Sequence, residues 1–169
     1  MTRERLQQQI AFAREVDQLK EITRQTYLLS GARKENDAEH SWNLALFAML
    51  LCEYAPAPGV DLVRVLGMVL IHDLVEIDAG DAYCYDDEAR RRHAALERVA
   101  AERIFGLLPE DQREHFRGLW DEFDARETPE ARFAAALDRL QPLLNNCFTG
   151  GRSWREHGVC ASEVLAGNE

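Results

Sequence analysis

The stretch that decides the fold covers residues 61–81 and reads DLVRVLGMVLIHDLVEIDAGD. Residues 62–71 are apolar on almost every side of a helix, and Asp61 stands where a helix cap is expected. We therefore predict a helix that begins after Asp61 and lies in the middle of a helical bundle. Its tail, from His72 to Asp81, carries several polar residues and ends at Gly80, because glycine readily adopts the conformation that closes a helix.

Helical periodicity also appears on both sides of this stretch, whereas the alternation typical of β-strands does not. The expected helices are marked by residues 10–22, 44–51, 62–81, 87–105, 116–123 and 128–145. A breaker cluster at 55–59 separates the second from the third, and Thr128 with Pro129 supplies a cap and first turn for the last. We predict an all-α, single-domain helical bundle over residues 1–169, with about six or more helices.

The charge and hydropathy of the chain restrict its partners. A net charge of −10 argues against a nucleic-acid duplex or an anionic membrane surface as the main partner. The longest apolar run, residues 63–71, is too short to cross a bilayer, and residues 1–20 contain no apolar core of a secretion signal. We therefore expect a cytoplasmic protein without a nucleic-acid or membrane partner. A small phosphorylated substrate is compatible with this charge, because a metal ion can hold a phosphate inside an acidic protein.

Four polar residues interrupt apolar helical patterns and predict a metal site. His72 and Asp73 follow a nearly uninterrupted apolar run, Asp138 follows residues 133–137, and His40 stands at the head of the second helix. Burying an ionised carboxylate costs several kcal/mol unless a cation or hydrogen bonds compensate. One divalent ion held by His40, His72, Asp73 and Asp138 would resolve this. Mixed nitrogen and oxygen ligands favour Mn, Co, Fe, Ni or Zn over Ca, and Mg is kept open.

Two further acids are candidates for catalysis. Glu76 lies three residues after Asp73, on roughly the same helical face, and could orient water, accept its proton or protonate a leaving oxygen. Asp81 follows Gly80 and can turn back toward the site. Each of these residues also has an ordinary structural explanation: Glu76 and Asp81 could form a solvated helix end, and Asp138 could pair with Arg139. The joint pattern is far more specific than any one of its parts.

The ordered pattern of H, HD and D resembles the HD-domain metal-dependent phosphohydrolases. Its extensions are DAEHSW at 37–42, IHDLVEIDAGD at 71–81 and LDRLQPLL at 137–144. Within that superfamily the chain is most similar to the 5′-deoxynucleotidases of the YfbR and HD domain-containing protein 2 type, over roughly residues 10–160.

The resemblance implies a helical HD fold, one divalent metal and hydrolysis of 2′-deoxynucleoside 5′-monophosphates to nucleoside and phosphate. By position, the ligands are His40, His72, Asp73 and Asp138. Glu76 matches the catalytic acid of the family, and Asp81 matches a second acid near the substrate. Arg24 matches an arginine that contacts the phosphate. Relatives are often dimers, so a homodimer is expected.

Some positions leave the substrate open. Gln25 replaces a tryptophan that follows the phosphate-binding arginine in the bacterial deoxynucleotidase, which bears on selection of the sugar. Arg33 could attract the phosphate or lie in a solvated loop. Trp154 and His157 could line the substrate pocket or form a C-terminal packing element. Hydrolysis of another phosphate ester and nucleotide binding without catalysis are the alternatives.

Overall fold

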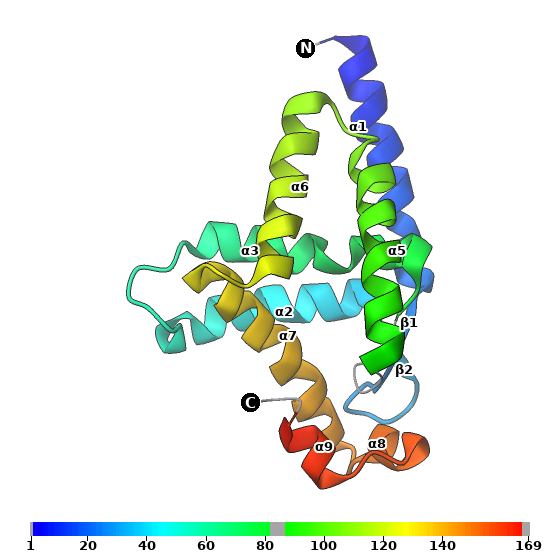
Figure 1. Cartoon of the computed structure of the whole chain (residues 1–169), viewed down its shortest axis with the longest axis vertical. Helices are drawn as coiled ribbons and strands as arrows, with labels where there is room; N and C mark the ends of the chain where they lie inside the picture. The colour runs from blue at the N-terminus through cyan, green and yellow to red at the C-terminus, as the bar shows by residue number, and fades with distance from the viewer. Residues whose placement is uncertain (1, 82–86, 167–169) are drawn as a thin grey trace.

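The computed structural model describes residues 2–81 and 87–166, with side chains from residue 93 onward in the second range. Helices dominate it, which confirms the predicted all-α class (Figure 1). The elements in chain order are α1 (Arg3–Val16), η1 (Asp17–Glu21), β1 (Thr23–Tyr27), β2 (Lys34–Asn36), α2 (Asp37–Leu51), η2 (Cys52–Tyr54), α3 (Leu62–Ile71), η3 (His72–Val75), α4 (Glu76–Ala79), α5 (Asp87–Phe105), α6 (Glu110–Ala125), α7 (Pro129–Phe148), α8 (Arg152–His157) and α9 (Ala161–Ala166). The elements labelled η are 3-10 helices.

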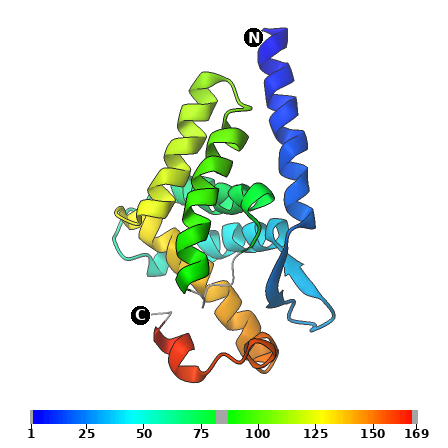
Figure 2. The ribbon, with the colours of Figure 1, turned by 45° about the vertical axis from the view of Figure 1, so that its right-hand side comes forward.

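Three helices that pack against one another form the centre of the bundle. The chain runs along α2, turns, and returns beside it along α3, and α7 packs against both (Figure 1). Helices α5 and α6 stand as a pair across them, with α1 beside α5 (Figure 2). Leu44 of α2, Met68 of α3 and Leu137 of α7 are all buried in one core. This packing brings the helices that carry the predicted metal ligands into contact.

The predicted helix starts follow from local capping. Asp61 accepts hydrogen bonds from the backbone N–H groups of Val63 and Arg64, which begins α3 as expected. Thr128 accepts from the N–H of Ala131 and caps α7, which carries a proline in its first turn. These caps confirm the predicted starts of α3 and α7. The end of α7 differs from the prediction, because the helix continues to Phe148 instead of ending near residue 145.

The prediction of one helix over residues 10–22 was wrong at its C-terminal end. Helix α1 ends at Val16, a 3-10 helix follows, and Thr23–Tyr27 forms a strand that pairs antiparallel with Lys34–Asn36. The β-favouring residues of the strand Thr23–Tyr27 pair with Lys34–Asn36, on the far side of a turn. The helical spacing of residues 10–22 contains no information about that pairing. The hairpin matters because side chains alternate between its faces, so Arg24 and Thr26 share the inner one.

The stretch of residues 61–81 also differs from the prediction. Helix α3 contacts α2, α6 and α7, but Val63 and Leu70 are 78% and 49% exposed, so it is not enclosed on all sides. The helix ends at Ile71 and tightens into the 3-10 helix η3 before the short α4. Gly80 ends α4 with φ 78°, as expected. The tightening has a use, because residues three apart are eclipsed along a 3-10 helix, and Asp73 and Glu76 are three apart.

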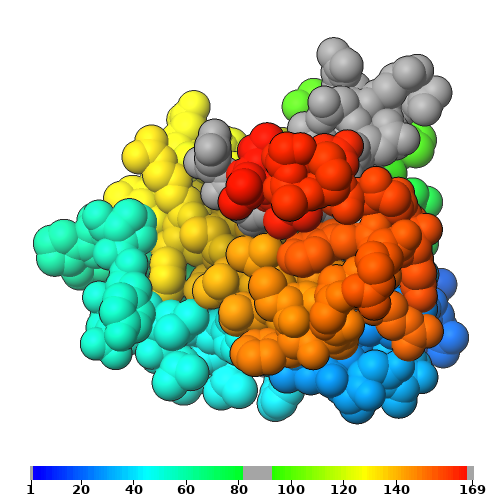
Figure 3. Space-filling model, turned by 90° about the horizontal axis from the view of Figure 1, so that it is seen from below, coloured from blue at the N-terminus to red at the C-terminus, as the bar shows by residue number. Residues whose placement is uncertain are grey.

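The last elements cover one end of the bundle. Helix α8 packs against β1 and α7, and Figure 3 shows α7 to α9, in orange to red, beside the blue hairpin. The Arg152 guanidinium lies 3.8 Å from the centre of the Tyr27 ring, and Arg152 also donates to the carbonyl of Gly31. Within the described ranges, no helix combines the length and apolar character needed to cross a membrane.

Candidate metal centre

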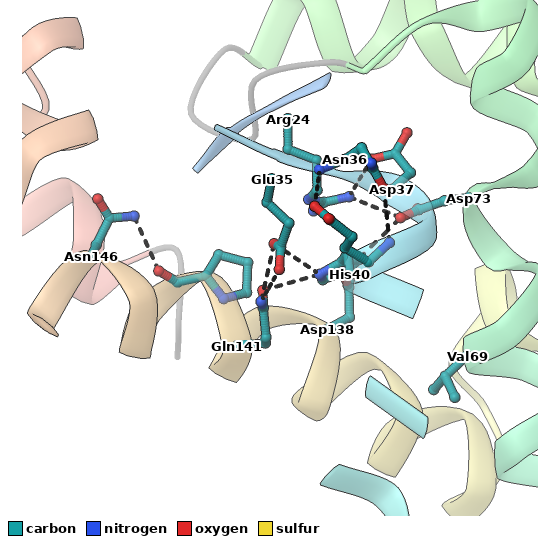
Figure 4. A network of polar contacts seen from close by, with 12 residues as sticks. Arg24, Glu35, Asn36, Asp37, His40, Val69, Asp73, Asp138, Gln141 and Asn146 are labelled. Atoms are coloured by element: carbon teal, nitrogen blue, oxygen red, sulfur yellow. Dashed lines mark hydrogen bonds and ion pairs between the residues drawn. The ribbon is translucent and has the colours of Figure 1, made fainter. Parts of the chain in front are cut away.

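The structure brings the four predicted ligands together. His40 comes from α2, His72 and Asp73 from η3, and Asp138 from α7. One nitrogen of His40, one nitrogen of His72 and one oxygen of Asp73 all lie within 4.8 Å of one another, and all three residues are buried. Asp138 Oδ1 lies 3.0 Å from His40 Nε2 and 3.5 Å from His72 Nε2. Four potential ligand groups from three separate elements therefore meet at one point. Figure 4 shows three of them, His40, Asp73 and Asp138.

The histidine at η3 fits a metal ligand in its hydrogen bonding. His72 Nδ1 lies 3.1 Å from the backbone carbonyl of Val69, which can only accept, so Nδ1 carries the proton. His72 Nε2 is then left with a lone pair, is buried, and has no hydrogen-bond partner among the described residues. A buried nitrogen lone pair beside two carboxylates is a suitable environment for a divalent cation.

The electrostatics of the cluster point the same way. Burial lowers the pKa of His72, but the charges of Asp73 and Asp138 outweigh it and raise the pKa above its usual value. Burial raises the pKa of Asp138, but its close contacts with the His40 and His72 rings, and their positive charge, outweigh it and hold that pKa well below its usual range. Both shifts mean that these residues favour positive charge between them, which is the condition for binding a metal ion.

Arg24 extends the cluster from the hairpin. Its Nη1 lies 2.8 Å from Asp73 Oδ2 and 3.1 Å from Asp37 Oδ1. Burial lowers the pKa of the guanidinium, but Asp73 and the neighbouring acids outweigh it and the net shift is upward. Arg24 Nε is buried and has no hydrogen-bond partner within the part of the chain that the structure describes, so this side chain retains a donor for a further ligand. The inward face of β1 is what directs Arg24 to the metal centre.

Three acids surround Arg24 and Asp73. Burial and then Asp73 raise the pKa of Glu76 well above its usual value, so this carboxyl holds a proton to a higher pH than an ordinary glutamate does. Burial and Asp73 raise the pKa of Asp37 to about 7. Burial, as the largest cause, also raises the pKa of Asp81. The structure therefore brings both acids predicted from the sequence, Glu76 and Asp81, to the centre.

Asp37 is a site residue that the sequence analysis missed. It is fully buried at the first position of α2 and contacts Arg24 directly. Its position three residues before His40, on the same helical face, was a signal that could have indicated it. The sequence analysis also missed Glu35 and Gln141. Both side chains are buried on the side of His40 that faces away from the other ligands.

Arg24 is the predicted substrate contact that reaches the cluster, whereas Arg33, Trp154 and His157 lie outside it. Arg33 donates to Glu39 at 2.8 Å, and both side chains are exposed to solvent to a large extent. Trp154 is half-buried and His157 is exposed, both on α8. His157 Nδ1 lies 2.9 Å from the carbonyl of Ser153, within its own helix. Because α8 packs on the elements that carry Arg24 and Asp138, these two residues lie at the same end of the molecule as the centre.

A model of the HD domain family matches residues 16–169, and the chain therefore belongs to that family. The resemblance seen in the sequence is thereby confirmed. A crystal structure titled as a predicted metal-dependent phosphohydrolase from Magnetospirillum magnetotacticum MS-1 is 52% identical, with a TM-score of 0.92. That match covers 97% of this chain and 82% of the other.

Two curated relatives carry a more specific name. The human 5′-deoxynucleotidase HDDC2 is 29% identical over 136 residues, which are 80% of this chain and 65% of the human protein. The 5′-deoxynucleotidase YfbR of Escherichia coli is 27% identical over 148 residues, or 83% of this chain and 67% of the other. The chain thus spans slightly less than two thirds of the human relative.

Proposed function

We propose that this protein is a metal-dependent phosphohydrolase that acts on nucleoside 5′-monophosphates, the deoxy compounds among them. The observation that carries the proposal is the buried group of His40, His72 and Asp73, to which Arg24 is directly hydrogen-bonded through Asp73. A metal site next to a buried guanidinium is suited to a phosphate group. The names of the two curated relatives support the nucleotide as its carrier.

The protein's own residues have distinct roles in this proposal. His40, His72, Asp73 and Asp138 hold one divalent ion, which can be Mn, Co, Fe, Ni, Zn or Mg. When bound, such an ion supplies Lewis-acid charge beside the phosphate and lowers the pKa of water. Arg24 binds phosphate oxygens through donors that Asp73 and Asp37 leave available.

The acids Glu76 and Asp81 act on the leaving group and on the attacking water. Glu76 holds a proton to a higher pH than an ordinary glutamate because its pKa is raised, and it donates this proton to the oxygen of the leaving nucleoside. Asp81 orients the attacking water. Arg33 attracts the phosphate, and Trp154 and His157 line the outer edge of the substrate pocket. Gln25 accepts a hydrogen bond from Lys34 at 2.6 Å through its side-chain oxygen.

We propose that residues 1–169 form one domain. We further propose that the protein acts in the cytoplasm, where nucleoside monophosphates occur, and that it has no nucleic-acid or membrane partner. We also propose a homodimer. Trp42, Met49 and Leu50 on α2 are 65%, 59% and 67% exposed, and a group of exposed apolar side chains on one helix supports self-association. Light scattering after size exclusion would give the mass directly.

The test is phosphate release by metal-stripped protein from a panel of deoxy- and ribonucleoside 5′-monophosphates, with each candidate metal added back. We expect release from the deoxy compounds that depends on the metal. Asp73→Ala should abolish both metal binding and release, whereas Glu76→Gln should retain the metal but lose most turnover. No release with any metal, despite stoichiometric binding, would shift the function to another phosphate ester or to nucleotide binding alone.

A further inference from the structure

A second polar chain lies behind the metal centre, on the side of His40 away from the ligand atoms. His40 Nδ1 lies 3.0 Å from Gln141 Oε1, and Gln141 Nε2 donates to both Glu35 oxygens at 2.8 and 3.0 Å. The three residues come from α2, α7 and β2, and they are 0%, 0% and 1% exposed. Figure 4 shows Gln141 between Glu35 and His40.

The donors and acceptors of this chain have only one consistent direction. An ionised carboxylate can only accept, so the Gln141 NH₂ group must face Glu35. The Gln141 carbonyl oxygen must then face His40, and it too can only accept. His40 Nδ1 must therefore carry a proton, and Nε2, which lies 3.0 Å from Asp138 Oδ1, is the nitrogen left to serve as a metal ligand.

Burying polar and charged side chains lowers the stability of the fold, so their presence here calls for a functional reason. A carboxylate at 1% exposure loses its hydration, and the described partners of Glu35 are the neutral amide of Gln141 and the His40 ring, whose Nδ1 lies 3.9 Å away. A hydrophobic side chain could fill the same volume at lower cost. The inward position of Glu35 on β2 also gives the hairpin a second use, because β1 directs Arg24 to the same centre.

We propose that Glu35 and Gln141 are positioning residues that fix His40 in the tautomer able to bind metal. This inference rests on the metal site of the proposed function. The carboxylate sets the orientation of the amide, and the amide sets the position of the imidazole proton. Nε2 is therefore the nitrogen that faces the centre before any metal arrives. Hydrogen-bond partners of this kind behind a metal ligand contribute about 10- to 100-fold to metal affinity.

The test uses two variants and one control. Gln141→Met keeps the length of the side chain and removes both hydrogen bonds. Glu35→Gln keeps the shape but removes the reason for a single direction, since an amide at position 35 can donate or accept. Asn146→Leu is the control, because it also removes a buried amide from α7, one that donates to the carbonyl of Pro142.

Two readouts separate a positioning role from a structural one. Long-range proton–nitrogen NMR correlations of the metal-free protein should show a proton on His40 Nδ1, a partial loss of that Nδ1 proton in Glu35→Gln, and a full loss of the Nδ1 preference in Gln141→Met. Calorimetric titration with Mn²⁺ should show affinity reduced by roughly 10- to 100-fold in Gln141→Met and by several-fold in Glu35→Gln. Asn146→Leu should match the wild type in both.

The outcomes distinguish this inference from the proposed function. Wild-type protein that binds none of the candidate metals would overturn the metal site itself, and the inference with it. Wild-type protein that binds metal while both variants bind equally well, with His40 unchanged in its tautomer, would overturn only the positioning role. Since Glu35→Gln preserves shape, it provides the answer even if Gln141→Met does not fold.

Discussion

On one side of the metal centre His40 is held by side chains from other elements, whereas on the other side His72 is held by the backbone of its own helix. Both present Nε2 to the same atom, Asp138 Oδ1. His40 depends on Gln141, which is distant in sequence, while His72 depends on the carbonyl of Val69, three residues earlier. The His72 ring also packs against Phe123, with 4.8 Å between the ring centres.

The difference teaches which parts of a metal site can be altered by substitution. The support of His72 exists wherever α3 ends in the same conformation, so no side chain can be changed to remove it. The support of His40 requires two particular polar side chains, Gln141 and Glu35, and each can be lost through one mutation. The two histidines should therefore respond differently to changes behind them, and identically to changes between them.

The largest effect is expected from Asp138→Asn, which alters the residue that the two sides share. The variant keeps the shape of the side chain but loses the negative charge, so metal binding should fall by roughly 100-fold or more. Calorimetry with Mn²⁺ measures this directly. An affinity within a few-fold of the wild type would show that the two histidines and Asp73 bind the metal without Asp138.

The second largest effect is expected in the pH dependence of stability. It arises from two carboxyls beside Arg24, namely Asp37 on the His40 side and Glu76 on the His72 side. The pKa of Asp37 is raised to about 7, so the folded protein holds this proton more tightly than the unfolded chain does. The stability gained is fully present below about pH 4 and is lost as the pH rises through about 7. The metal-free protein should thus become less stable between pH 5 and pH 8, by roughly a few kcal/mol.

Urea unfolding at several pH values tests this prediction. Asp37→Asn should flatten the slope and still accept the hydrogen bond from Arg24. Glu76, whose pKa is also raised, should leave part of the slope in place. Asp121→Asn, a change at an exposed position of α6, serves as the control and should leave the slope unaltered. A slope that is the same in Asp37→Asn and in the wild type would show that Asp37 does not titrate in this range.

The sequence predicted those parts of the molecule that depend on neighbouring residues. Asp61 and Thr128 cap their helices through contacts two or three residues away, and Gly80 ends α4 through its own backbone. His72, Asp73 and Asp138 were also visible, because a polar residue in an apolar helical pattern is conspicuous. The structure brings these three residues to one point together with His40.

The parts that the sequence did not predict depend on distant pairing. Glu35 stands in the polar run Arg33–Asn36 and resembles a solvated loop residue until the hairpin buries it. Gln141 lies three residues after Asp138 on one face of α7, a spacing that indicates a shared environment but not a partner. Arg33 is a different case, since this basic residue just before the first ligand motif pairs with Glu39 and lies outside the cluster.

The smallest effect on metal binding is expected from Val69→Ala, the substitution closest to the support of His72. Val69 is fully buried, so the loss of its methyl groups should cost about 2 kcal/mol of unfolding free energy. Its carbonyl remains, and His72 should keep its tautomer and the Mn²⁺ affinity should stay within about two-fold. Gln141→Met should instead lower the Mn²⁺ affinity by roughly 10- to 100-fold. If Val69→Ala instead weakened metal binding by ten-fold or more, His72 would be held by packing and not by the carbonyl, and the contrast between the two histidines would disappear.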